Sequence, residues 1–175
     1  MNIRTLEGSD ASEYYKLRLE ALVESPAFFG ESDEEFSKKS IDSLAKTISE
    51  RNLEDCNFLL GAFDSESTLI GMVGIAQQKG VKREHYCLLW GMYVTPSARG
   101  QRVGKSLVEE AIRLSRQIEA IEGIKLCVEV NNTAAKQLYR SMGFSTYGTE
   151  PKAMKLQGQY YDEHMMVLDF NADKP

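Results

Sequence analysis

The feature that most constrains the fold is a pair of strand-like runs joined by a whole helix. The run "YCLLWGMYV", residues 86–94, is apolar enough for a buried strand. A helical pattern with one apolar stripe follows from about Val103 to Glu119, and "IKLCVEV", residues 124–130, is typical of a second buried strand. Strands joined through a helix pair in parallel by a right-handed crossover. The sequence therefore predicts at least one parallel strand pair.

The remaining segments add further strands and helices around this unit. A first helix is expected after a cap at Ser9 or Asp10, with "SPAFFGESDEE" as a loop behind it. Two more helices are expected, over "IDSLAKTISERN" and over "NTAAKQLYRSM", where Gly143 ends the helix. The other expected strands are "IRTL", "NFLLGAFD", "TLIGMVGIAQQ", "FSTYGTE" and "YYDEHMMVLDF". This order predicts one mixed α+β domain over residues 1–175.

Length and charge restrict the class of protein. A chain of 175 residues can bury a sizeable core without disulfides or metals. No run approaches the ~20 apolar residues of a membrane span, and "MNIRTLEGSD" is too polar for a signal peptide. The formal net charge of −5 argues against nucleic acid as a partner and is compatible with cationic partners such as amines.

The cysteines and histidines favour neither a disulfide nor a metal site. Cys56, Cys87 and Cys127 lie far apart, each in an apolar run, so we expect reduced, buried thiols in a cytoplasmic protein. His85 and His164 share no helical spacing with other ligand types, so no metal is expected.

The junction between the first strand and its helix reads "TPSARGQRVGKSL". A helix start presents unpaired backbone N–H groups and the positive end of the helix dipole. Gly100 and Gly104 allow a ligand to approach the backbone, and Arg99, Arg102 and Lys105 add positive charge. The array suits a pyrophosphate. A solvated basic helix start is the alternative, and the spacing matches neither a P-loop nor GxGxxG.

A second motif lies about thirty residues further on, in "VEVNNTAAKQLYRSMGF". It contains N-x-x-A-x-x-L-Y-x-x-x-G-F over Asn132–Phe144, and R-G-x-x-x-G covers Arg99–Gly104. Together the two motifs resemble the GCN5-related N-acetyltransferase (GNAT) superfamily, over the element order from about Ile3 to Phe170. The resemblance implies an α+β fold: a mostly antiparallel twisted sheet of six to seven strands, with one splayed parallel pair and about four flanking helices.

The resemblance also implies acetyl-CoA as co-substrate, bound where the two parallel strands splay apart. The family pattern has glycine at position 102, where this chain has Arg102; its N–H stays available if its backbone angles are not ones reserved for glycine. The positions implied to bind the cofactor are Met92, Tyr93, Val94, Arg99, Gly100, Gln101, Arg102, Val103, Gly104, Lys105, Ser106, Asn132, Ala135, Lys136 and Tyr139.

In this family the acetyl group passes directly from the thioester to an amine, and Tyr139 occupies the position of the general acid. The base is open: the strand before the junction has no carboxylate, which leaves Glu84, Glu129 or a water chain. Glu129 either faces solvent, pairs with Lys or Arg, or serves the reaction, because a buried unpaired charge is costly.

Amine recognition is expected from two variable segments that carry aromatics beside carboxylates, with Phe28, Phe29, Glu31, Tyr160 and Tyr161 as candidates. The acceptor is a small-molecule or peptide amine, with a protein N-terminus, a polyamine, an amino-sugar drug and an amino-acid-like metabolite left open. A homodimer is possible in this family. The main alternative function is a coenzyme A sensor or docking module that has lost catalysis, and a nucleotide-binding enzyme is a third.

Overall fold

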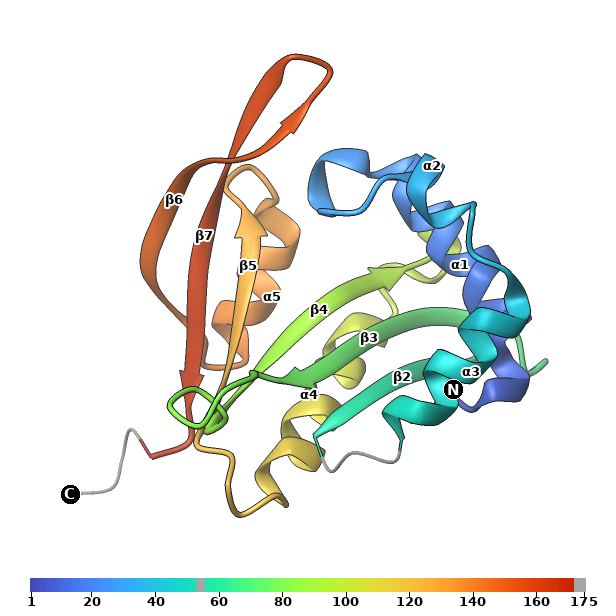
Figure 1. The fold of residues 1–175 in the computed structure, drawn as a ribbon, viewed down its shortest axis with the longest axis horizontal. Helices are drawn as coiled ribbons and strands as arrows, with labels where there is room; N and C mark the ends of the chain where they lie inside the picture. The colour runs from blue at the N-terminus through green and yellow to red at the C-terminus, as the bar shows by residue number, and fades with distance from the viewer. Residues whose placement is uncertain (53–55, 172–175) are drawn as a thin grey trace.

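The computed structural model describes residues 1–52 and 56–171, and its centre is one mixed sheet (Figure 1). The described residues form seven strands in the order β1-β2-β3-β4-β5-β7-β6. Of the adjacent pairs, β4 with β5 is parallel and the others are antiparallel. The strands are β1 (Asn2–Thr5), β2 (Asn57–Phe63), β3 (Leu69–Gln77), β4 (Tyr86–Val94), β5 (Gly123–Glu129), β6 (Ser145–Leu156) and β7 (Gln159–Asp169).

Helices cover both faces of the sheet (Figure 1). Helices α1 (Ala11–Glu24) and α3 (Ile41–Arg51) lie on one face, and α4 (Val103–Arg116) and α5 (Thr133–Ser141) lie on the other. The short α2 (Asp33–Phe36) follows α1. None of the helices in the described ranges is long and apolar enough to cross a membrane. The predicted α+β fold, with its single parallel pair made through α4, is confirmed.

Two apolar cores hold these layers together, one on each face of the sheet. On the α4 side, Leu107 and Ala111, spaced at i and i+4 on the helix, pack with residues such as Leu126 of β5. On the α1 side, Leu17 and Met72 belong to the second core. Alternating residues of β3 and β4 supply both cores, because successive side chains of a strand point to opposite faces.

The parallel pair separates soon after it begins. Its register runs only from Tyr86 opposite Gly123 to Leu88 opposite Lys125, although β4 and β5 both continue well beyond these residues. A bulge in β4 at Gly91, whose φ is +64°, shifts the register with β3. The C-terminal halves of β4 and β5 therefore leave a gap between them.

Three segments differ from the sequence expectation. Helix α4 ends at Arg116, about three residues early, because Gln117 and Ile118 bond the carbonyls three residues back in a tighter turn. The predicted loop contains α2, where Ser32 and Glu35 form a reciprocal capping box. Strand β6 continues to Leu156, and the resulting β6–β7 hairpin projects past the rest of the sheet (Figure 1).

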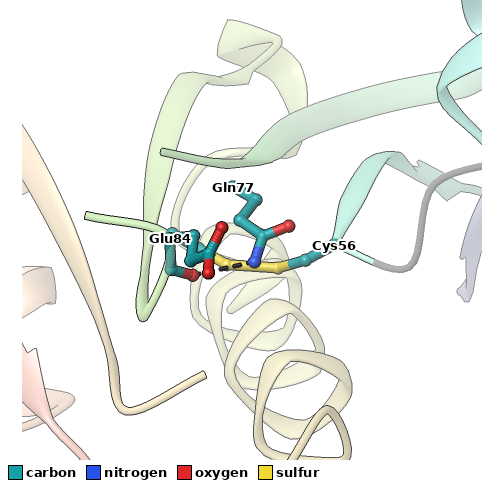
Figure 2. The surroundings of a disulfide bond; sticks show 4 residues. Cys56, Gln77 and Glu84 are labelled. Carbon is teal, nitrogen blue, oxygen red and sulfur yellow. Dashed lines mark hydrogen bonds between the residues drawn. A yellow bond between two sulfur atoms is a disulfide. The ribbon is translucent and has the colours of Figure 1, made fainter. Parts of the chain in front are cut away.

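The expectation of three reduced, buried cysteines is wrong. Cys56 and Cys87 form a disulfide (Figure 2). Cys127 is free and exposed. The pairing follows from strand order: Gln77 of β3 lies opposite Cys87 of β4, and its N–H donates to the carbonyl of Cys56 over 2.7 Å. The Gln77 side chain donates to the carbonyl of Glu84 over 2.8 Å, closing the same corner (Figure 2). Sequence spacing alone could not show this, because the two cysteines are 31 residues apart.

Candidate functional site

A cavity of about 620 Å³ opens where β4 and β5 separate. Its walls come from the C-terminal half of β4, the start of α4, the end of β5, α5 and the short 3₁₀ turn η2 (Pro26–Phe28). The predicted residues that line it are Phe28, Phe29, Met92, Tyr93, Val94, Arg99, Gly100, Arg102, Val103, Gly104, Lys105, Glu129, Asn132, Ala135 and Tyr139.

The start of α4 forms one wall and presents open backbone donors. Arg102 is the N-cap residue and its side chain makes no capping hydrogen bond, so the first amides of the helix stay unpaired. The first turn carries no acidic residue. Gly104 packs against β4, since a Cβ there would lie 2.9 Å from Cε of Met92. A diphosphate fits this wall, because its charge meets the helix dipole and free N–H groups.

Arg102 occupies backbone space that favours glycine. Its φ of +64° and ψ of +9° place it in the left-handed region, as does the φ of +77° at Gly100. An arginine can adopt this left-handed conformation at a modest cost in free energy, so the loop has the backbone geometry that glycine favours with an arginine in place. The exposed Arg102 side chain borders the cavity.

Arg99 holds the loop to α1. Its Nη1 and Nη2 bond the two carboxylate oxygens of Glu24 at 2.8 and 2.5 Å, and its Nε donates to the carbonyl of Val94 over 3.0 Å. The bond from Arg99 lowers the pKa of Glu24. Arg99 thus fixes the end of β4 against α1 with its charge already paired.

Tyr93 belongs to the same network. Its hydroxyl lies 3.0 Å from Oε1 of Glu20 and 2.9 Å from Oε2 of Glu24. Burial, and then these hydrogen bonds, raise the pKa of Tyr93. The ring borders the cavity while the hydroxyl points to α1, so Tyr93 supports the wall.

Tyr139 brings a phenol to the cavity from α5. Its side chain is 5% exposed and packs edge-on against Phe144, with ring centroids 5.7 Å apart. Burial raises the pKa of Tyr139, so the phenol keeps its proton at neutral pH. Asn132 caps α5 by accepting from the N–H of Ala135 over 3.1 Å, which fixes the helix that carries Tyr139.

Glu129 lines the cavity from the end of β5 and is 3% exposed. Its oxygens accept hydrogen bonds from the backbone N–H and side-chain Nδ2 of Asn131, at 2.8 and 2.9 Å. Neither structural alternative for Glu129 is correct: it faces no bulk solvent and its partner is an amide rather than Lys or Arg. Two local donors are what allow a carboxylate to be buried here.

Two further carboxylates extend from Glu129 across the sheet, an arrangement that the sequence did not predict. Glu163 of β7 lies opposite Glu129, and Glu150 of β6 lies opposite Glu163. Burial raises the pKa of Glu163, with smaller contributions from Glu150 and Glu129. Only the register of three strands brings these residues together.

Several predicted residues lie outside the cavity wall. Glu84 is exposed at the opposite end of β4, and Tyr160 and Tyr161 lie near the tip of the β6–β7 hairpin. The ammonium group of Lys136 bonds the carbonyl of Val130, and Glu31 pairs with Arg18 and Lys39. Two further residues predicted to bind the cofactor, Gln101 and Ser106, also lie outside the cavity wall.

The cavity also has lining residues that sequence reasoning did not single out. Trp90 and Gly91 come from the bulged part of β4, and Cys127 from β5. Within residues 1–52 and 56–171, no group of three or more His, Cys, Asp or Glu side chains is placed to hold a metal ion.

Comparison with known proteins places this site in a family. Residues 18–144 match the acetyltransferase (GNAT) family. A curated relative, the L-amino acid N-acetyltransferase AaaT of Escherichia coli K12, is 27% identical over 102 residues, which cover 58% of this chain and only 62% of that protein.

Solved structures share the fold. A GNAT-family acetyltransferase from Streptococcus pneumoniae superposes with a TM-score of 0.87 at 22% identity, covering 96% of this chain and 98% of that one. The yncA protein of Salmonella typhimurium, solved with its cofactor acetyl-CoA, gives a TM-score of 0.84 at 19% identity over 97% and 94% of the two chains.

Proposed function

Because the chain belongs to the acetyltransferase (GNAT) family, we propose that it transfers an acetyl group from acetyl-CoA to a primary amine in the cavity between β4 and β5. The observation that carries this proposal is the composition of the cavity wall. It places the uncapped amides at the start of α4 and the buried phenol of Tyr139 around one space.

The residues present fit acetyl-CoA. The amides from Val103 to Lys105 would hold the diphosphate, with Arg102 and Lys105 as the side-chain cations on that wall. The separated part of β4 offers backbone groups to the pantetheine arm, because pairing with β5 ends at Leu88. When bound, acetyl-CoA supplies an acetyl thioester.

The acceptor must lose a proton to become a nucleophile. An amine with a pKa near 10.4 is uncharged in about one molecule in a few thousand at pH 7. Glu129 is placed to take that proton, since it is the carboxylate that borders the cavity and its Asn131 bonds fix its orientation. Glu163, the neighbour across the strands, gives the proton an onward site.

The leaving thiolate needs a proton, and we assign its donation to Tyr139. The phenol is protonated at neutral pH because burial raises its pKa, and Phe144 fixes the ring in the cavity wall. A positioned acid of this kind contributes roughly 10²–10⁴-fold to rate.

Release of free thiol from acetyl-CoA, measured with a panel of amines, tests the proposal. The wild type should turn over at least one amine, and Tyr139→Phe should lower kcat by roughly 10²–10⁴-fold while keeping its melting temperature. Tight binding of acetyl-CoA without turnover of any amine would instead identify a coenzyme A sensor.

A further inference from the structure

One buried cation beside the cavity lacks full pairing. The Arg18 side chain of α1 is 7% exposed, and its Nε and Nη1 have no hydrogen-bond partner among the described residues. The remaining nitrogen, Nη2, lies 3.4 Å from Oε2 of Glu31. Lys39 bonds the other oxygen of Glu31, so one carboxylate is shared by two cations. Buried donors without a partner are costly, which makes this arrangement a candidate for ligand binding.

The unpaired Nη1 of Arg18 lies directly behind the cavity wall. Gly91 leaves a small gap there: a Cβ at this glycine would lie 3.5 Å from Nη1, and no other described atom lies within 4 Å apart from Gly91 and its two chain neighbours. On another side, Cζ of Arg18 lies 4.8 Å from the centre of the Phe29 ring. Gly91 and Phe29 both line the cavity. A small anion that moves the Phe29 ring aside could therefore reach Nη1 from the cavity.

A negative group faces the same space from the other strand. Leu126 and Val128 of β5 pack into the core on the α4 side, so Glu129 points to the opposite face, where α1 carries Arg18. The 3₁₀ turn η2 packs against β5 and β6, and so spans this face between α1 and the Glu129 side. The acceptor side of the cavity thus has a positive end at Arg18 and a negative end at Glu129.

We propose that the acceptor is an amino carboxylate of the α-amino acid class, whose carboxylate binds Arg18 while its amino group faces Glu129. This inference rests on the proposed function and names its substrate class. The end of the guanidinium formed by Nη1, which has no partner, and Nη2, which Glu31 holds only at 3.4 Å, matches a carboxylate bidentately. The bulge at Gly91 lies just beyond the point where β4 stops pairing with β5. In an α-amino acid one carbon separates the carboxylate from the amino group. A carboxylate bound to Arg18 beside Gly91 therefore leaves the amino group close to the gap between the two strands. A polyamine would instead place a second ammonium group against Arg18.

The test compares L-amino acids with their α-amides, which keep the amine and side chain but lose the negative charge. Free thiol release is measured for the wild type, Arg18→Met, Arg18→Lys and the control Arg113→Gln, which removes an exposed cation on α4. For its preferred amino acid the wild type should favour the acid over the amide by roughly 100-fold in kcat/KM, as expected when hydrogen bonds to a charged group are lost.

The variants separate recognition from stability. Arg18→Met should bring the acid-to-amide ratio to within a few-fold while acetylation of the amide persists, and Arg113→Gln should keep the wild-type ratio. If Arg18→Met does not fold, Arg18→Lys decides, because it keeps the charge and loses the bidentate geometry and should lower the ratio about tenfold.

Other results overturn the inference and leave the proposed function standing. These are efficient acetylation of spermidine or of a peptide N-terminus in place of amino acids, or an equal loss with acid and amide in the Arg18 variants. If no amine is acetylated, the proposed function fails, and thermal melting with the amino acid panel still decides the role of Arg18. A stabilisation by amino acids that their amides do not give, and that is smaller in Arg18→Lys, supports it, and no such stabilisation refutes it.

Discussion

Replacing Arg102 tests whether the loop before α4 keeps a glycine-like backbone. The residue sits at φ +64° and ψ +9°, where a Cβ costs about 1–2 kcal/mol. Glycine removes that cost but loses roughly 0.4–1 kcal/mol, because its unfolded chain is more flexible. Arg102→Gly should therefore be more stable than Arg102→Ala by about 0.5–1 kcal/mol, the difference of these terms. Both variants lose the same side-chain contacts, so the comparison isolates the backbone.

The assay is urea unfolding of the wild type and both variants, followed by circular dichroism at fixed pH and salt. The midpoints should rank glycine above alanine with equal slopes, because neither change alters the surface buried on folding. Equal midpoints, or alanine above glycine, would show that residue 102 is not left-handed in solution. A matched change at the exposed Lys105, which lies within the helix, should give the reverse order, since glycine is the poorer helix former.

The same variants separate the backbone role of Arg102 from a charge role. If the guanidinium contacts phosphate, KM for acetyl-CoA should rise in both variants, and the rise should shrink as salt is added. If only the backbone matters, Arg102→Gly should keep the wild-type KM at all salt concentrations.

Three further predictions concern other parts of the molecule. Glu163→Gln should raise the free energy of unfolding at pH 8 by less than about 1 kcal/mol and leave it unchanged near pH 3. The pKa of Glu163 is raised in the folded protein, so above that pKa its charged form lowers the free energy of unfolding. Below the pKa of the unfolded chain the side chain is neutral in both states and has no such effect. Equal stability of the wild type and Glu163→Gln at pH 8 would contradict this prediction. Glu24→Gln should change stability by less than about 1 kcal/mol, since the Arg99 pair is half exposed, but raise KM for acetyl-CoA several-fold by freeing the loop; an unchanged KM would contradict it. Thiol titration of the unreduced, denatured protein should find one thiol, that of Cys127, and three after reduction, whereas three from the start would refute the disulfide.

Two walls of the cavity could be predicted, because each is formed by one continuous segment of sequence. The stretch Arg99–Gly104 and the stretch Asn132–Phe144 each fold locally, as a helix start and a capped helix. Their donors and the Tyr139 ring therefore follow from local rules. The parallel pair was predictable for the same reason, because a helix joins its two strands in sequence.

The residues that could not be predicted depend on register between distant strands. Glu163 and Glu150 join Glu129 only after β5, β7 and β6 have paired. The Cys56–Cys87 disulfide likewise needs three strands in place. Arg18 gave no local signal either, since a charged residue within a helix is normally exposed, and its burial appears only once α1 packs on β4.

Because β4 diverges from β5, the C-terminal half of β4 has an unpaired edge inside the domain. An exposed edge of this kind recruits other chains and promotes aggregation, and proteins usually cover or shorten it. This unpaired edge of β4 is flanked by α1 and η2 on one face of the sheet and by α4 and α5 on the other. A narrow extended molecule can therefore reach it, whereas another polypeptide strand cannot. Alternate amides of this stretch bond β3, so only those between Gly91 and Val94 that face away from β3 should exchange rapidly with solvent deuterium in the free protein, and they should slow markedly once a thioester arm binds there.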